Sequence, residues 1–157
     1  MKNNRIEIKT GQYKIVSIQD NLAFLATNLK EEIALSLYSI KLKKVALGKS
    51  LSPQQITNIF AEMNPENLND SELIIVRIVG GQDSKQSEEY IESLVRQLQI
   101  IDGGQNIINI KSFDVGSRVH PSAIEIDCYH GGLRADSNIE RTDFLNDLKR
   151  SLEEVNN

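Results

Sequence analysis

Residues 73–81 read Leu73-Ile74-Ile75-Val76-Arg77-Ile78-Val79-Gly80-Gly81 and form the strongest strand pattern of the 157-residue chain. A nearly continuous apolar run is typical of a strand that is covered on both faces, and paired glycines end such a strand. We therefore expect a central strand here, with the core packed around it. The length of the chain fits a single domain over residues 1–157.

Helical patterns lie on both sides of this strand and near the end of the chain. Before it, Ser52-Pro53-Gln54-Gln55 has the residues of a capping box with proline at the first helical position, which predicts a helix over 52–63. After it, apolar residues four apart predict a helix over about 84–101. Leucines spaced three and four residues apart predict a last helix over about 138–155.

The remaining apolar segments are short, and their spacing predicts strands. In the first half of the chain they indicate a meander of antiparallel strands, and after the second helix two more strands and a hairpin follow. We expect an α+β fold, an α/β sandwich of mostly antiparallel sheets packed with about three helices. The expected strands cover residues 5–9, 13–18, 22–27, 33–38, 45–47, 107–110, 123–129 and 133–134.

The composition is that of a globular protein with a mildly acidic surface. Hydrophobic residues make up 39% and charged residues 25%, and the net charge is -4. This charge argues against nucleic-acid binding, and the small lysine group at Lys41, Lys43 and Lys44 is interpreted as a solvated strand end or turn. The absence of a long apolar run predicts no membrane insertion, and one cysteine allows no internal disulfide. We expect a cytoplasmic protein, although export without a Sec signal would leave the same pattern.

Gly80-Gly81-Gln82 follows a strand and precedes a helix, which is where phosphate-binding turns lie. No Gly-x-Gly-x-x-Gly pattern accompanies it, and no Lys followed by Ser or Thr. A structural turn is the plain interpretation, with a small-ligand or nucleotide site as the alternative. We expect no bound cofactor.

Cys128 and His130 are the residues closest to a catalytic pair. On a strand they would face the same side, where an imidazole can lower the pKa of a thiol, and Asp114 or Asp127 could orient the ring. The alternative, which we favour, is that Cys128 is a small buried hydrophobic residue. Together with His120 these residues give only three soft ligands without a zinc-binding spacing, so no metal site is expected.

Several segments occur in an order that is known from one family. Residues 33–38 and 45–47 look like a strand pair, and residues 76–81 look like an apolar strand that ends in Gly-Gly and leads into a helix. Residues 110–116 (Ile-Lys-Ser-Phe-Asp-Val-Gly) and 132–134 (Gly-Leu-Arg) complete the series. In this order the chain resembles, over about 100 residues, the CheD family, the chemoreceptor glutamine deamidases of bacterial and archaeal chemotaxis.

The resemblance implies two catalytic positions that this chain fills differently. The family attacks a receptor glutamine with a cysteine just before the first strand of the pair, assisted by a histidine on the next strand. The matching positions are Glu32, or Glu31 with a one-residue slip, and Leu47. Glutamate cannot form a thioester and leucine cannot accept a proton, so the deamidase chemistry is expected to be absent. Thr27 matches a threonine of the family.

Without the catalytic residues, the resemblance implies a CheD-like sandwich that acts as a non-catalytic protein-binding module, linked to chemotaxis signalling. The family binds helical receptor tails and a phosphatase, so the expected partner is a helical receptor or signalling protein. Two alternatives stay open: a cysteine-dependent hydrolase or deamidase that uses Cys128 and His130, and a secreted bacterial effector.

Overall fold

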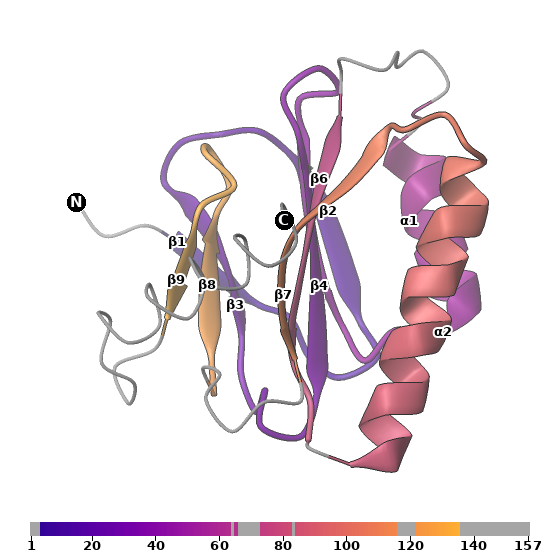
Figure 1. Ribbon diagram of the computed structural model, residues 1–157. Helices are drawn as coiled ribbons and strands as arrows, with labels where there is room; N and C mark the ends of the chain where they lie inside the picture. Colours follow the sequence, from indigo (N-terminus) through magenta and orange to yellow (C-terminus); the bar gives the residue numbers. More distant parts are fainter. Residues whose placement is uncertain (1–3, 64, 66–72, 83, 116–121, 136–157) are drawn as a thin grey trace.

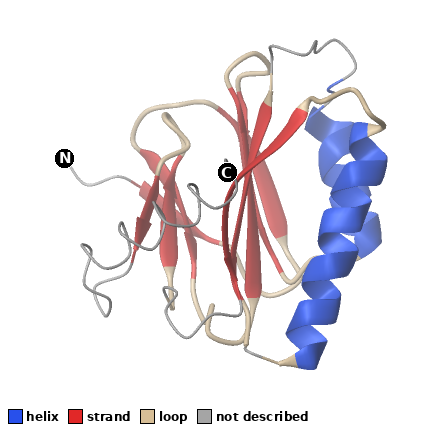
Figure 2. Ribbon diagram, in the orientation of Figure 1, coloured by secondary structure: helices blue, strands red, loops and turns tan. Residues whose placement is uncertain are grey.

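The protein folds into three layers, seen in a computed structural model that describes residues 4–63, 65, 73–82, 84–115 and 122–135 (Figure 1). A five-stranded sheet lies in the middle. Two helices cover one of its faces, and a four-stranded sheet packs against the other (Figure 2). The expected α+β class is confirmed, with sheets that contain both parallel and antiparallel pairs.

The middle sheet has the strand order β2-β5-β4-β6-β7. All seven residues of β4 are buried, because β4 has a neighbour on each side and a layer on each face. β6 pairs in parallel with β7, and α2 provides the crossover that a parallel connection requires. The strands are β2 (Tyr13–Ser17), β4 (Ile33–Ser39), β5 (Lys44–Lys49), β6 (Ile74–Gly80) and β7 (Ile108–Val115).

The second sheet has the order β1-β3-β8-β9. Its first pair is parallel and the other two pairs are antiparallel. Its strands are β1 (Asn4–Glu7), β3 (Leu22–Ala26), β8 (Ile124–Asp127) and β9 (Leu133–Ala135).

Local hydrogen bonds and backbone geometry set the start of α1 and the end of α2. In α1 (Pro53–Met63) the Ser52 hydroxyl accepts from the backbone N–H of Gln55 at 3.3 Å, and the Gln55 side chain accepts from the N–H of Ser52 at 2.9 Å. This is the reciprocal capping box that the sequence predicts. α2 (Lys85–Asp102) ends at Gly103, whose left-handed φ of 58° lets the chain turn away from the helix.

Two apolar clusters hold the layers together, one on each face of the middle sheet. Because successive strand residues point to opposite faces, β4 sends Leu35 and Leu37 toward the helices and Ala34 and Tyr38 toward the second sheet. The strand expected at 73–79 behaves in the same way, and its coverage on both faces is confirmed. Its helix-side residues are Ile74, Val76 and Ile78, and its apolar residues on the other face are Ile75 and Val79.

Two expectations about the fold need correction, and a third concerns residues that the structure does not describe. The antiparallel meander is wrong for the first half, since β1 pairs in parallel with β3 and β2 joins the other sheet. Alternating apolar residues fix which face of a strand is buried but not which strand lies beside it. The strand expected over 123–129 ends at Asp127. The helix expected over 138–155 lies outside the described residues.

Candidate functional site

The loop between β3 and β4 carries Glu32, the residue at the nucleophile position of the resemblance. The backbone N–H of Leu29 donates to the carbonyl of Ser122 at 2.9 Å, and the N–H of Glu32 donates to the carbonyl of Asn28 at 3.0 Å. Asn28 adopts a left-handed φ of 62°, which closes this tight turn. The loop is therefore a fixed structure that sets the direction of Glu32.

Gly80 and Gly81 support the same loop from β6. The N–H of Gly81 donates to the carbonyls of both Leu29 and Glu32, each at 2.9 Å. A Cβ on Gly80 would lie 2.2 Å from the Glu32 carbonyl oxygen, so only glycine allows the two segments to approach this closely. The Gly-Gly turn expected at this position is confirmed as a structural turn, and its N–H group serves the backbone.

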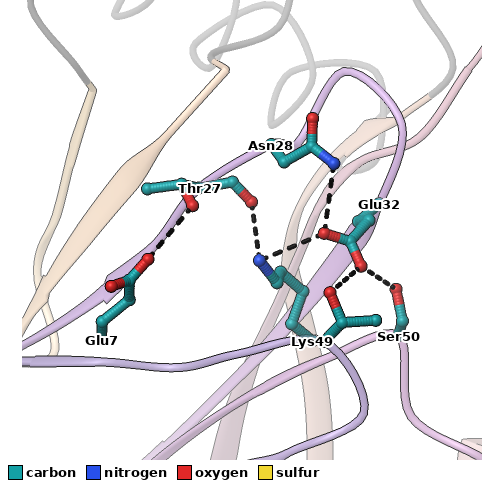
Figure 3. Close-up of polar contacts among 7 residues, drawn as sticks. Glu7, Thr27, Asn28, Glu32, Lys49 and Ser50 are labelled. Atoms are coloured by element: carbon teal, nitrogen blue, oxygen red, sulfur yellow. Dashed lines mark hydrogen bonds and ion pairs between the residues drawn. The ribbon is translucent and has the colours of Figure 1, made fainter.

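The carboxylate of Glu32 accepts hydrogen bonds from four side chains, as Figure 3 shows. The Thr10 hydroxyl donates to Oε1. The Ser50 hydroxyl also donates to Oε1, at 3.3 Å, while Asn28 donates to Oε2 at 3.4 Å and Lys49 Nζ lies 3.1 Å from Oε2. We call these five residues the Glu32 cluster.

Lys49 reaches Glu32 from the end of β5, the strand next to β4. Its side chain is only 5% exposed, and that of Glu32 is 15% exposed, so the ion pair is shielded from water. The ammonium group also donates to the Thr27 carbonyl oxygen at 3.0 Å. A lysine held this deeply needs a carboxylate partner, because an unpaired buried charge is costly.

Glu32 is held in its ionised form. Burial by itself would raise the pKa of its carboxyl group, but the donors around it, Thr10 and Lys49 foremost, outweigh burial and lower that pKa below its ordinary value. A carboxylate that already accepts from four donors and has a lowered pKa is a weak base. The Ser50 hydroxyl, which donates to it, therefore has no effective base to activate it.

A pocket of about 310 Å³ opens beside the Glu32 cluster, between β4 and the start of α2. Its lining is mostly polar, and part of it is engaged internally: Ser87 accepts from the N–H of Gln82 at 3.0 Å, and the Tyr90 hydroxyl donates to the Leu51 carbonyl at 2.8 Å. The exposed groups at its rim are Glu31, Gln82 and Gln86. The lining residues are Glu31, Glu32, Ile33, Ser50, Gln82, Ser84, Gln86, Ser87 and Tyr90.

Glu32 and Leu47, the two positions derived from the resemblance, have different surroundings. Leu47 is fully buried between the two sheets, opposite Ser36 of β4. The residue that meets Glu32 is Lys49, two positions further along β5 on the same face. Sequence reasoning missed Lys49, and the only signal was a lysine that follows the apolar residues of this strand.

Cys128 and His130 do not form a reactive pair. They lie in the turn that follows β8, and Cys128 is fully buried whereas His130 is exposed. Burial, with a smaller effect from the Asp127 charge, raises the pKa of the Cys128 thiol to about 12. The Asp127 carboxylate accepts from the N–H of Tyr129 at 2.8 Å, and the His130 ring lies edge-on to the ring of Tyr129. The thiol is therefore protonated and shielded.

The other positions singled out from the sequence either have a structural role or lie outside the described residues. Lys44 donates to the Glu62 carbonyl at 2.8 Å, and Lys43 lies in the β4–β5 turn with φ of 56°, which confirms the interpretation as a turn. His120 lies outside the described residues, and so does the side chain of Asp114. Within the described ranges, no three His, Cys, Asp or Glu side chains gather where they could hold a metal ion, and no helix is long and apolar enough to cross a membrane.

Comparison with known proteins connects the chain to one relative. No family model matches it. A protein of Rickettsia conorii, named uncharacterized protein RC0132, is 46% identical to it over 66 residues. The match covers 88% of the Rickettsia protein and 42% of this chain. The chain therefore belongs to the same family as this Rickettsia protein.

Proposed function

We propose that this protein is a non-catalytic protein-binding module on a CheD-like scaffold, with a helical receptor or signalling protein of the chemotaxis type as its partner. The observation that carries the proposal is the Glu32–Lys49 ion pair at the position that the resemblance gives to the nucleophile. Both groups are committed to each other and to neighbouring donors and acceptors, so neither is available for chemistry on a substrate.

The pocket beside the ion pair supports binding in place of catalysis. The amides of Gln82 and Gln86 and the carboxylate of Glu31 are exposed at its rim, where they can exchange hydrogen bonds with a partner. Ser87 and Tyr90, which also line the pocket, are engaged in hydrogen bonds within the protein. A pocket whose inner groups are fixed and whose rim has available polar groups suits recognition of a partner surface.

The proposal is tested with helical peptides that carry exposed glutamine side chains. We expect them to shift the backbone NMR signals of residues around the pocket and to release no ammonia on prolonged incubation with the protein. The substitution Gln86→Arg at the rim should weaken binding about tenfold or more. Ser93→Arg, on an exposed site of α2 that does not line the pocket, should leave binding unchanged.

Two results would overturn this proposal. Ammonia release that exceeds the peptide-only blank and disappears in Glu32→Gln would show that the Glu32 cluster is catalytic. If Gln86→Arg, Ser93→Arg and the unchanged protein bind equally well, the binding surface does not include the rim of this pocket.

The cysteine-dependent alternative has its own test. A thiol with a pKa of about 12 carries very little thiolate near neutral pH, so native Cys128 should react with iodoacetamide orders of magnitude more slowly than the same residue in urea. Rapid native alkylation, with a rate that falls in His130→Ala, would restore the cysteine hydrolase as a candidate.

A further inference from the structure

The middle sheet ends at β2, which has a neighbouring strand on one side. Among the described residues, β2 pairs with β5 and with no other strand, and β1 at the edge of the second sheet likewise pairs only with β3. An edge strand has backbone N–H and C=O groups that no neighbouring strand uses. Only residues 8–12 connect β1 to β2, so the two edges lie on the same side of the sandwich (Figure 1).

The register with β5 identifies the open backbone groups of β2. The N–H of Ile18, just after the strand, donates to the carbonyl of Lys43 at 2.9 Å. Hydrogen-bonded residues alternate along an antiparallel pair, so the even-numbered residues of β2 bond to β5. Tyr13, Ile15 and Ser17 therefore direct their N–H and C=O groups away from β5.

The open stretch of β2 is short and has defined ends. The carbonyl of Ser17 accepts from the side-chain amide of Gln19 at 3.1 Å, which occupies the last acceptor of this edge. Before the strand, Gly11 adopts a left-handed φ of 73°, and the chain turns there toward β1. The stretch that remains open contains the N–H and C=O groups of Tyr13 and Ile15.

A groove of about 430 Å³ lies along this part of β2. One flank comes from β1, the other from α1, and the start of β2 lies between them. We call it the edge groove, and its lining residues are Ile6, Glu7, Ile8, Gln12, Tyr13, Lys14 and Gln55. It shares no lining residue with the pocket beside Glu32, so the two are separate surfaces.

The shape of this edge indicates what can bind to it. A single extended chain needs only the spacing of one strand, about 4.8 Å, and its backbone can bond to the open groups. A helix cannot do so, because its own backbone groups are already paired. A second copy of the protein is disfavoured, since a five-residue strand between two flanks offers far less area than the roughly 1,200 Å² or more of a stable dimer.

The side chains of the edge groove leave the backbone as the main basis of recognition. Its two charged residues, Glu7 and Lys14, have opposite signs, so no net charge selects the partner. Ile6 of β1 is half-buried and gives one flank an apolar contact, whereas Gln55 gives the α1 flank a polar one. A bound strand with apolar and polar residues in alternation matches these two flanks.

We propose that β2 binds an extended peptide segment of a partner protein, which adds to the middle sheet as a further strand. The segment bonds to the open N–H and C=O groups of Tyr13 and Ile15, and its alternate side chains face Ile6 and Gln55. This contact does not depend on the pocket beside Glu32 or on a helical partner bound there.

Two peptides of one sequence test the backbone contact. The first is a short peptide in which valine alternates with threonine, with a methyl group on every second backbone nitrogen. These methyl groups block one edge of the peptide, which prevents its assembly into extended sheets and leaves the other edge free for β2. The control peptide has a methyl group on every backbone nitrogen, so both of its edges are blocked.

Hydrogen exchange of the full chain, followed by NMR, gives the direct readout. Without peptide, the N–H groups of residues 13 and 15 should exchange faster than those of residues 14 and 16, which bond to β5. A saturating amount of the peptide with one free edge should slow exchange at residues 13 and 15 about tenfold or more. The control peptide should leave this alternation unchanged.

Ile15→Pro and Ile15→Ala are a matched pair of variants. Both remove the half-buried isoleucine side chain, but only proline removes the N–H that points away from β5. We expect the affinity for the first peptide, measured by fluorescence anisotropy with a dye on the peptide, to be about tenfold lower in Ile15→Pro than in Ile15→Ala. The comparison of the two peptides uses the unchanged protein and does not depend on the stability of either variant.

The proposal fails on any of four results. Equal binding of the two peptides, or equal affinity of the two variants, would exclude a backbone contact at this edge. Slowed exchange that is confined to residues outside β2 would place the peptide elsewhere. Concentration-dependent self-association that slows exchange at residues 13 and 15 and is lost in Ile15→Pro would show that a second copy of the chain occupies the edge.

Discussion

Charged side chains have different roles at the two ends of β4. At the start of the strand, Lys49 is buried against Glu32, and the donors nearby also point at that carboxylate. The half-buried Arg77, which lies on β6 opposite the middle of β4, extends to the other end and donates to the backbone of a turn whose tyrosine is exposed. One end satisfies its own polar groups, and the other end uses them to hold an exposed side chain in place.

The comparison teaches how a polar cluster can be distinguished from a reactive site. A catalytic carboxylate needs a pKa near the working pH and access to the substrate, whereas Glu32 has a lowered pKa and four donors. At the other end, Tyr38 and Arg77 use their hydrogen bonds to hold the backbone of the turn that carries Tyr129. Five predictions test this contrast, from the largest expected effect to the smallest.

The largest effect is expected for Gly80→Ala, at the Glu32 end. The new Cβ would lie 2.2 Å from the Glu32 carbonyl and 2.9 Å from the Leu29 carbonyl, and the backbone φ of 113° disfavours alanine. We expect the free energy of unfolding to fall by roughly 3–5 kcal/mol, measured by urea denaturation. Gly11→Ala, with φ of 73° and open space around it, should cost only about 1 kcal/mol. Equal losses would show that the close approach of the loop to β6 is unimportant.

Glu32→Ala should destabilise the fold by about 2–3 kcal/mol, because it leaves the Lys49 ammonium buried without a counter-charge. The double substitution Glu32→Leu/Lys49→Met should recover most of this loss, since it removes both charges. Calorimetry or urea denaturation measures both variants. A double variant less stable than Glu32→Ala would mean that the ion pair contributes net stability beyond avoiding an unpaired charge.

Gly131→Ala tests the turn at the other end of β4. A Cβ there would lie 2.5 Å from the Tyr38 ring, and the φ of 67° adds backbone strain. Because the ring can shift where a backbone carbonyl cannot, the expected loss is about 2 kcal/mol, smaller than for Gly80→Ala. Hydrogen exchange should accelerate in residues 127–132 before it changes elsewhere. Unchanged protection of this turn would argue against its rigid attachment to the middle sheet.

Ser36→Ala addresses the middle of β4, between the two ends. The Ser36 hydroxyl is buried and has no hydrogen-bond partner among the residues that the structure describes. Replacing it with alanine removes an unsatisfied polar group and should raise the free energy of unfolding by about 0.5–1 kcal/mol. A stability loss of similar size would indicate that the hydroxyl has a partner in solution, such as a bound water molecule.

The smallest effect is a pH dependence that belongs to Glu32. A carboxyl group whose pKa is lowered on folding stabilises the protein above its ordinary pKa of 4.5, and this stability is lost as the pH falls through the folded-state pKa. The stability difference between the unchanged protein and Glu32→Gln should therefore be constant near neutral pH and shrink by less than about 1 kcal/mol below pH 4.5. A difference that grows on acidification would contradict the lowered pKa.

Local features of the fold were predictable because they depend on residues close together in the chain. The capping box of Ser52 and Gln55 needs only four consecutive residues, and it forms as predicted. The glycine that ends α2 and the coverage of β6 on both faces follow from equally short patterns. The pairs β4–β5 and β8–β9 were also expected, and both form. The partners of β1 and β2 did not follow, because alternation in one strand contains no information about the strand beside it.

The candidate site shows the same limit. Glu32 was singled out by its position in the order of segments, and the resemblance placed the matching histidine position at Leu47, whereas the residue of β5 that meets Glu32 is Lys49. A shift of two residues along a strand keeps the side chain on the same face, so the sequence pattern cannot separate the two positions. Thr10, from a loop far away in the sequence, joins the cluster only through tertiary contact.

The amino-acid sequence thus determined where the helices and most strands lie and which of their faces are apolar, since these depend on local hydrogen bonding and on periodicity. The sequence also favoured a buried Cys128, which is confirmed. Tertiary structure alone decided that Glu32 is neutralised by Lys49 and that His130 is exposed. The physical reason is that charge pairing and desolvation depend on distances in space, and segments far apart in the chain set those distances only after they pack.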